Sequence, residues 1–338
     1  MGTKFREGDL IETKDNIVFD VKGVVHPPDR VVAFIRYVPD PNGNRERDGK
    51  HYSKYYALAK RYDLLKREYP QYLVDDPVFN TLLCEVPVED IKHHYQPAQG
   101  IQDLRAKTKL DEAETAALRF MQVLQEKSGV EWSKLGVSGS ILVNLQEPSS
   151  DIDLVVYGSK TGYKVAETMK NLLKDKNSPF EAYDIQGLKE LFDFRSKDTN
   201  VSFEDFVRTD SRKISHGKFM GKHFFIRFVK DHNEISEQYG SIIYNPQGNA
   251  TIKATVADAS ESLFTPCTYK LTNVETLEGP KVEPIEEIVS FRGRFCEHAK
   301  SGENVIAHGK LERIQQKGKS DHYRLLLGSK PSDHMNLI

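Results

Sequence analysis

The sequence predicts an α+β protein in which a central mixed sheet with helices is flanked by an N-terminal β-rich domain and a C-terminal small β-barrel. Three patterns along the 338 residues support this prediction. Short strand-like runs fill residues 1–105, helical and strand-like segments alternate over 106–235, and evenly spaced strand-like runs return over 236–338. A chain of this length exceeds one core of average size, so several domains are expected.

Composition indicates an ordinary soluble protein. The formal net charge is −2 and charged residues make up 29% of the chain, so there is no global basic bias toward nucleic acid. No apolar run approaches the roughly 20 residues that span a bilayer, and the N-terminus lacks the apolar core of a signal peptide. The cysteines Cys84, Cys267 and Cys296 are far apart, which argues against a disulfide framework or a thiolate zinc site. We expect a cytoplasmic protein with no membrane partner, from an archaeal or bacterial source.

The N-terminal part begins with three runs rich in Val, Ile and Phe, separated by turn residues. The runs cover residues 9–13, 17–25 and 30–37. This pattern predicts a small barrel or a curled sheet.

The next segment, residues 50–73, is dense in Tyr and Lys and partly helical in pattern. Interleaved aromatic and basic residues can stack on bases and hold phosphates. Alternatively, the segment is an amphipathic helix whose Lys heads reach water. The adjacent pair His93-His94 is a poor metal chelator without a third ligand, so we interpret it as part of a polar linker.

The central part opens with the clearest helical pattern, over 108–128. Its apolar residues recur every three or four positions, which predicts one core-facing stripe, and Gly129 supplies the stop. A short apolar strand at 135–138 then runs into Gly139-Ser140. A helical turn and a Ser-rich loop lead to a second strand, which begins with Asp151-Ile152-Asp153.

The two aspartates of this second strand are two positions apart, so both carboxylates project from the same side. Ile152 and Leu154 then face the other side and can pack in a core. Paired anionic oxygens suit Mg²⁺, or Mn²⁺ as an alternative, which binds through carboxylates plus substrate phosphates. The Gly139-Ser140 turn offers backbone N–H groups and a hydroxyl to those phosphates, and Ser138 could assist.

This arrangement resembles the DNA polymerase β-like nucleotidyltransferase superfamily. The matching pattern is an apolar strand, Gly139-Ser140, a spacer of ten residues, and then Asp151-Ile152-Asp153-Leu154. Ser149-Ser150 before the aspartates and Gly158 after the strand are also similar to the family. The resemblance covers residues 105–235 at most, and it implies a nucleotidyltransferase-fold sheet for the central part.

The resemblance implies a Mg²⁺-dependent enzyme. It would move a nucleoside monophosphate from a nucleoside triphosphate such as ATP to an acceptor hydroxyl and release pyrophosphate. Asp151 and Asp153 would be the catalytic, metal-binding residues, and Gly139, Ser140 and Ser138 would bind the nucleotide. Two β-rich flanking domains favour RNA or DNA as the acceptor, and the oligomeric state stays open.

Two departures from the family pattern motivate an alternative. Many relatives carry a third carboxylate on a later strand, but the matching strand here, 224–230, places Phe225 and Arg227 there instead. Relatives also often have a basic residue and Gly where this chain has Val143-Asn144. The alternative is therefore a slow or inactive nucleotide-binding or nucleic-acid-binding protein on the same scaffold. Four nearby acids could replace the missing one, namely Glu181, Asp184, Asp231 and Glu234.

Basic residues supply further candidate contacts to phosphate or acceptor. Those we select are Arg212, Lys213, Lys218 and Arg227. A solvated turn is the competing interpretation of this cluster. Helices are also predicted near 164–174, 188–195 and 203–209. In the C-terminal part a positive face on the OB-like barrel and scattered solvated charges are equally compatible with the basic residues Arg292, Arg294, Lys310, Arg313 and Arg324.

Overall fold

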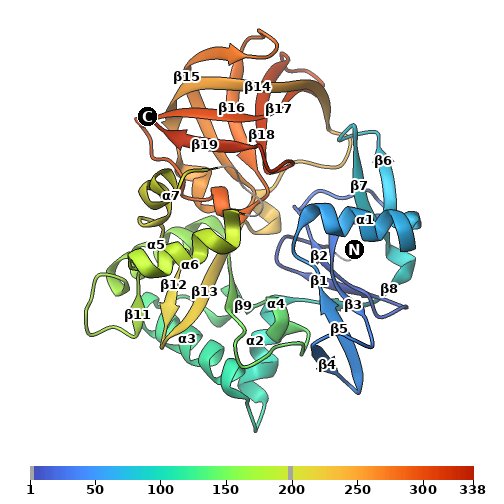
Figure 1. Ribbon diagram of the computed structural model, residues 1–338, viewed down its shortest axis with the longest axis vertical. Coiled ribbons are helices and arrows are strands. Elements are labelled where there is room, and N and C mark those ends of the chain that lie inside the picture. The colour runs from blue at the N-terminus through green and yellow to red at the C-terminus, as the bar shows by residue number, and fades with distance from the viewer. Residues whose placement is uncertain (1–3, 197–200) are drawn as a thin grey trace. The chain divides into compact units, whose positions relative to one another are not determined.

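In the computed structural model, residues 4–196 and 201–338 are described, and the chain divides into two compact units. The first unit comprises residues 1–75, 82–182 and 214–236, and the second comprises 76–81, 183–213 and 237–338. Within the described residues, helices combine with three sheets, which confirms the predicted α+β class (Figure 1). No helix in those ranges has the length and apolar character to cross a membrane.

An eight-stranded curled sheet forms the N-terminal part of the first unit, and it confirms the three predicted strands. Its order is β4-β5-β3-β2-β1-β8, with β7 pairing both β3 and β6. The strands are β1 (Leu10–Thr13), β2 (Val18–Val21), β3 (Arg30–Pro39), β4 (Arg45–Arg47), β5 (Lys50–Lys54), β6 (Leu73–Asp76), β7 (Thr81–Pro87) and β8 (Ile91–Tyr95). Helix α1 (Leu58–Glu68) buries Leu64 and Leu65 in the same apolar core as β1 to β3.

The Tyr- and Lys-rich segment is partly helical, as expected, because strand β5 at its start is followed by α1. One sequence-based interpretation of this part is wrong. The pair His93-His94 is not in a linker, because it lies in β8, which is hydrogen-bonded to β1. His94 also has a specific partner, since its Nε2 lies 2.8 Å from an Asp9 carboxylate oxygen.

A five-stranded sheet with the order β11-β12-β13-β10-β9 forms the rest of the first unit. The strands are β9 (Leu135–Val137), β10 (Ile152–Tyr157), β11 (Phe180–Glu181), β12 (His216–Phe219) and β13 (Lys222–Val229). Strand β13 covers the strand expected at 224–230 and lies parallel to β10, and β9 is antiparallel to β10. The helices of this part are α2 (Pro97–Ala106), α3 (Glu112–Ser128), α4 (Gly139–Leu142) and α5 (Ser159–Leu172).

Helix α3 matches the predicted apolar stripe but starts four residues later. Asp111 is its N-cap, because its side chain accepts from the Glu114 N–H while the Glu114 side chain accepts from the Asp111 N–H. Gly129 ends the helix in the left-handed conformation at φ +61°. The buried Phe120 ring lies 4.6–5.1 Å from the ring centroids of Phe180, Phe219 and Phe224. This aromatic cluster fixes the helix against the sheet.

The second unit contains a sheet that closes on itself. Its order β14-β15-β16-β18-β17 is completed by pairing of β17 with β14, and β19 adds to β17. The strands are β14 (Ile242–Asp258), β15 (Cys267–Glu278), β16 (Ile285–Ser290), β17 (Asn304–Gln316), β18 (His322–Leu327) and β19 (His334–Leu337). Strands β16 and β18 are parallel, whereas the other pairs are antiparallel. Helices α6 (Ile185–Arg195) and α7 (Phe203–Asp210) also belong to this unit, and Ser202 caps α7 as predicted.

Short 3₁₀ turns connect several of these elements. In the described residues they include η1 (Pro70–Tyr72), η2 (Val88–Asp90), η3 (Trp132–Lys134), η5 (His232–Glu234), η6 (Ser260–Leu263) and η7 (Gly293–Phe295). All three cysteines are free and buried.

Candidate active site

Strands β9 and β10 bring the Gly-Ser turn against the second aspartate. The Ser138 N–H donates to the Asp153 carbonyl oxygen at 2.8 Å, directly before the chain turns at Gly139. Gly139 has φ +62°, and a Cβ atom there would lie 2.9 Å from the Asp153 Cβ and Cγ atoms. A side chain at position 139 is thus excluded by both backbone conformation and space. The turn and Asp153 form one site.

Asp151 and Asp153, called here the Asp pair, share one side of the chain at the start of β10. Ile152 and Leu154 point the other way and are 0% and 1% exposed, as the alternation predicts. Partial burial and the charge of Asp153 raise the pKa of Asp151 above its usual value. Among the described residues, neither carboxylate has a side-chain hydrogen bond or an ion pair. Two adjacent, uncompensated acids favour a cation between them.

Two cations of the N-terminal sheet face the Asp pair. Arg36 lies on β3 and Lys54 on β5, and both interact electrostatically with Asp153. The Tyr56 ring lies beside both, with its centroid 4.5 Å from the Arg36 Cζ atom and 4.4 Å from the Lys54 Nζ atom. Neither cation lies within 4.0 Å of a carboxylate in the part of the chain that the structure describes.

Lys54 has an unusual electrostatic environment. Burial and the neighbouring Arg36 lower its pKa to about 7, although Asp153 acts in the opposite direction. The charge of the Asp pair is therefore matched across the site by two positive groups that stop short of direct pairing. Such an arrangement is suited to a ligand that carries both a cation and anionic groups.

The N-terminal sheet also holds the loop that connects the Gly-Ser turn to the Asp pair. Arg45 forms an ion pair with Glu147 at 3.0 Å and donates to the Leu145 carbonyl oxygen. Arg47 donates to the Val143 carbonyl oxygen at 3.1 Å. Leu142, Val143 and Leu145 share an apolar cluster with residues of β1, β2, β3 and β5. The first unit thus builds the site from both of its sheets.

At Val143-Asn144, where the sequence departs from the pattern of the superfamily that it resembles, Asn144 adopts φ +52°, a left-handed conformation that favours Gly. Asn tolerates this conformation better than most residues, so the backbone path does not require glycine. The basic residue expected next to it is absent from the loop, but Arg36 and Lys54 bring positive charge from the N-terminal sheet.

The remaining predicted nucleotide-binding residues lie at the turn. Ser138 donates its hydroxyl hydrogen to the Gly8 carbonyl oxygen at 2.7 Å, which fixes the N-terminal segment. Ser140 is buried, and its carbonyl oxygen accepts from the Leu145 N–H at 2.9 Å. Ser140 therefore also shapes the loop that leads to the Asp pair.

The predicted basic contacts occupy other positions. Arg227 does not pair with the aspartates, because it forms an ion pair with Glu7. Lys218 lies on β12, opposite His223 of β13 and Glu181 of β11. Only these two of the four candidates belong to the unit that contains the Asp pair.

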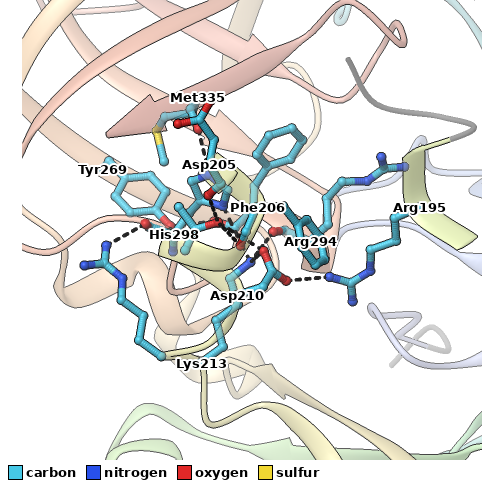
Figure 2. Close-up of polar contacts among 12 residues, drawn as sticks. Arg195, Asp205, Phe206, Asp210, Lys213, Tyr269, Arg294, His298 and Met335 are labelled. Carbon is cyan, nitrogen blue, oxygen red and sulfur yellow. Dashed lines mark hydrogen bonds and ion pairs between the residues drawn. The ribbon is translucent and has the colours of Figure 1, made fainter. Parts of the chain in front are cut away.

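Arg212 and Lys213 belong to the second unit, where acids already balance them. Arg212 pairs with Glu303 at 2.6 Å and donates to the His298 carbonyl oxygen at 2.7 Å. Lys213 is buried within a network that we call the Asp210 cluster. Its members are Arg195, Asp210, Lys213 and His298, shown in Figure 2. Pairing and burial explain why these side chains are not exposed phosphate contacts.

The basic residues of the closed sheet are largely paired as well. Lys310 and Arg324 both contact Glu312, at 2.6 and 2.8 Å, and Arg313 pairs with Asp321. These acids neutralise three of the five residues that could form a positive face. At these three positions the structure therefore favours balanced charges over a positive face.

Within the described residues, strand β13 carries no acid, and the four acids that the sequence analysis offered as substitutes lie elsewhere. Phe225 is the register partner of Asp153. Asp231 pairs with Lys134 at 2.6 Å, beside Gly158 and beyond the far end of β10. With about 3.3 Å per residue, that end is about 20 Å from the start of the strand. Glu234 accepts from the Ser159 N–H at the same end.

The two earlier acids are also separate from the Asp pair. Glu181 lies on β11, and two strands, β12 and β13, stand between it and β10. Asp184 belongs to the second unit, where its carboxylate accepts from the Gly187 N–H and caps α6. In the described ranges, no group of three or more His, Cys, Asp and Glu side chains is placed to hold a metal ion.

Sequence reasoning missed Arg36 and Lys54. Arg36 lies within a largely apolar strand, and Lys54 is the last residue of β5, in a segment whose pattern predicts partial helix. A charged residue within an apolar strand is the one signal that could have selected Arg36. Arg36 is more than 100 positions from the Asp pair, so the sequence alone does not indicate that the two interact.

Comparisons with known proteins identify a relative. No family model matches the chain, and no solved structure matches it. Over 334 residues the chain is 30% identical to the uncharacterized protein MJ1086 of the archaeon Methanocaldococcus jannaschii, and the alignment covers 96% of each chain. The match therefore spans both units rather than the motif alone. This chain belongs to the same protein family as MJ1086.

Proposed function

We propose that this protein is a Mg²⁺-dependent nucleotidyltransferase. One observation carries the proposal: among the described residues the Asp pair, in contact with the Gly139 turn, has no direct ion pair, and it interacts electrostatically with Arg36 and Lys54, which have none either. A metal–triphosphate complex has the complementary charges, because its cation suits the carboxylates and its phosphates suit the basic side chains. The sequence resemblance to the polymerase β-like superfamily, which rests on the same Gly-Ser turn and Asp pair, supports the same assignment.

The residues present fit a magnesium ion. Asp151 and Asp153 supply two hard oxygen ligands, and the mutual repulsion that raises the pKa of Asp151 is relieved by a cation. Substrate phosphates and water would complete the coordination. When bound, Mg²⁺ supplies Lewis-acid polarisation of the phosphate oxygens.

The side chains and backbone of the site then position the nucleotide. The Gly139 turn can approach the phosphates closely, because it has no side chain, and Ser140 offers a further donor. In the transfer, an acceptor hydroxyl oxygen bonds to the α-phosphorus while the bond from that phosphorus to the bridging oxygen of pyrophosphate breaks. The hydroxyl proton passes to solvent, and pyrophosphate leaves. The contribution of the protein is mostly positioning and charge stabilisation.

For the acceptor we propose an RNA or DNA end. The support is architectural: the second unit contains a closed ring of five strands with one parallel pair, β16 and β18, which is similar to an OB-fold. Such modules often bind single strands by base stacking as well as by charge. The acceptor assignment rests on this architecture and not on a basic surface.

The test is direct. Purified protein is incubated with Mg²⁺, each of the four α-labelled ribonucleotides or deoxyribonucleotides, and RNA or DNA oligonucleotides. We expect label on an oligonucleotide, stoichiometric pyrophosphate, and loss of both in Asp151→Asn and Asp153→Asn. The proposal fails if wild-type protein neither transfers label nor binds Mg²⁺ with a nucleotide.

A second candidate function is supported by one observation, the presence of Phe225 where relatives have an acid. The same scaffold would then bind nucleotide or nucleic acid without turnover. Nucleotide binding that depends on Mg²⁺ and on the Asp pair, with no pyrophosphate released, would select this candidate.

A further inference from the structure

Among the described residues, the candidate site contains ligands for one divalent ion but not for a second. Phe225 occupies the register position beside Asp153, and the four other acids considered have separate partners or positions. Two carboxylates suffice for one ion that also binds phosphate oxygens. Two-metal sites place a second ion about 3.5–4 Å away, which requires additional oxygen ligands.

Positive charge is nevertheless present next to the Asp pair. Arg36 and Lys54 both interact with Asp153, and Lys54 also interacts with Asp151. Tyr56 holds the two cations at 4.5 and 4.4 Å from its ring centroid. Cation–π contacts orient such groups without neutralising their charge. Anionic phosphates next to Lys54 would favour its charged form and oppose the burial that lowers its pKa to about 7.

Arg36 and Lys54 differ from the neighbouring arginines of β4 in having no direct ion pair among the described residues. Arg45 and Arg47, on the adjacent strand β4, pair with Glu147 and Glu12 at 3.0 and 2.8 Å. Partly buried cations with a structural role normally have such partners, because unpaired burial is costly. Arg36 and Lys54 instead have only longer-range carboxylate interactions, Arg36 with Asp20 and Asp153 and Lys54 with Asp153 and Asp151.

We propose, on the basis of the proposed function, that the site binds one divalent cation per nucleotide and that Arg36 and Lys54 supply the charge that a second ion provides elsewhere. The planar Arg36 guanidinium can donate to two phosphate oxygens at once, and the Lys54 ammonium is a compact point charge. Their task is to stabilise the negative charge that gathers on the departing pyrophosphate.

The first experiment counts metal ions. Mn²⁺ is titrated into the full-length protein with a saturating α,β-methylene analogue of each nucleoside triphosphate, and bound Mn²⁺ is measured by electron paramagnetic resonance. We expect one Mn²⁺ per chain. Two ions per chain would overturn the inference while leaving the proposed function intact. Absence of any Mn²⁺ would defeat both.

The second experiment separates a ligand role from a structural role. In Lys54→Met and Arg36→Met we expect affinity for the analogue to fall at least tenfold, whereas affinity for Mn²⁺ alone does not fall. Lys50→Met is the matched control, because Lys50 is exposed on the same strand. Lys54→Arg should restore most of the analogue affinity.

Unchanged analogue binding in both variants would overturn the inference, as would an equal loss of Mn²⁺ and analogue binding. Thermal melting of each variant identifies any that do not fold. In that case the ion count on the wild-type protein decides, since it requires no substitution.

Discussion

The Asp pair and the Asp210 cluster both bring charged side chains together, but their charges are balanced in opposite ways. In the Asp210 cluster, Asp210 accepts from Arg195 at 2.7 Å and from Lys213 at 3.1 Å (Figure 2). Lys213 also donates to the Arg294 carbonyl oxygen at 2.6 Å. In the Asp pair, the opposing charges stop short of contact. A closed network of partners indicates a structural role, whereas an open one indicates a place for a ligand.

Neutralising the Asp pair should give the largest effect. For Asp151→Asn or Asp153→Asn we expect nucleotide transfer to fall by about 10³-fold or more, because the metal ligands are lost. The free energy of unfolding should stay equal or rise, since repulsion between the two carboxylates is removed. Transfer assays and urea denaturation measure the two quantities, and Asp63→Asn, at an exposed position of α1, is the control. A large loss of stability would mean that the pair is structural.

Neutralising Asp210 in the Asp210 cluster should give the reverse result, a loss of stability without a loss of metal binding. Asp210→Asn leaves the buried Lys213 without its carboxylate, so we expect the free energy of unfolding to fall by about 3–5 kcal/mol. Binding of Mn²⁺ by folded protein should not change. Urea denaturation followed by circular dichroism provides the measurement, with Asp193→Asn at an exposed position of α6 as the control. A stable variant that has lost metal binding would contradict the comparison.

The Asp210 cluster also predicts a pH dependence. Burial and Lys213 lower the pKa of His298 from 6.5 to about 4. Below pH 6.5 the unfolded chain binds a proton that the folded chain does not, so the free energy of unfolding falls as pH drops from 6.5 to 4. The total loss from this residue is about 3 kcal/mol.

Denaturation curves of wild type and His298→Gln at several pH values check this dependence. The difference between them isolates His298 from His26 of the first unit, whose pKa is also lowered to about 4. If the difference does not vary between pH 4 and 6.5, His298 does not titrate as expected.

The smallest effects are expected for substitutions of two glycines that have nearly the same backbone conformation. Gly129 and Gly139 have φ +61° and +62°, but only at Gly139 would a Cβ atom collide with Asp153. Gly129→Ala should cost about 1 kcal/mol of stability through left-handed strain alone. Gly139→Ala should cost that amount and also lower Mn²⁺ affinity about tenfold by displacing the carboxylate. Equal effects of the two substitutions on Mn²⁺ affinity would show that the turn does not position Asp153.

Local pattern was enough to predict much of the first unit. Alternation placed Ile152 and Leu154 in the core, and the β-branched run at 224–230 marked the strand beside β10. The capping residue Asp111 was missed, so the start of α3 was predicted four residues early. These outcomes follow from short-range rules of periodicity and capping.

Contacts between distant segments could not be predicted in this way. Nothing near position 36 or 54 indicates that these side chains face residues 151 and 153, because only the pairing of whole strands creates that proximity. In the same way, Arg212 and Lys213 belong to a basic run in the sequence, yet folding gives each an acidic partner. Charge in a sequence is therefore a poor guide to charge available for a ligand.

The path of the chain between its two units limits how the molecule can be dissected. The polypeptide leaves the first unit at residue 182 and returns at 214, and a six-residue piece, 76–81, is also counted with the second unit. Cutting after residue 236 would therefore separate α6 and α7 from the rest of the second unit and leave them on the N-terminal fragment. Deleting 183–213 would force β11 and β12 into a new hairpin. Neither unit is one continuous stretch of sequence. A single recombination event therefore cannot remove or transfer one unit without the other, so the two would be inherited together.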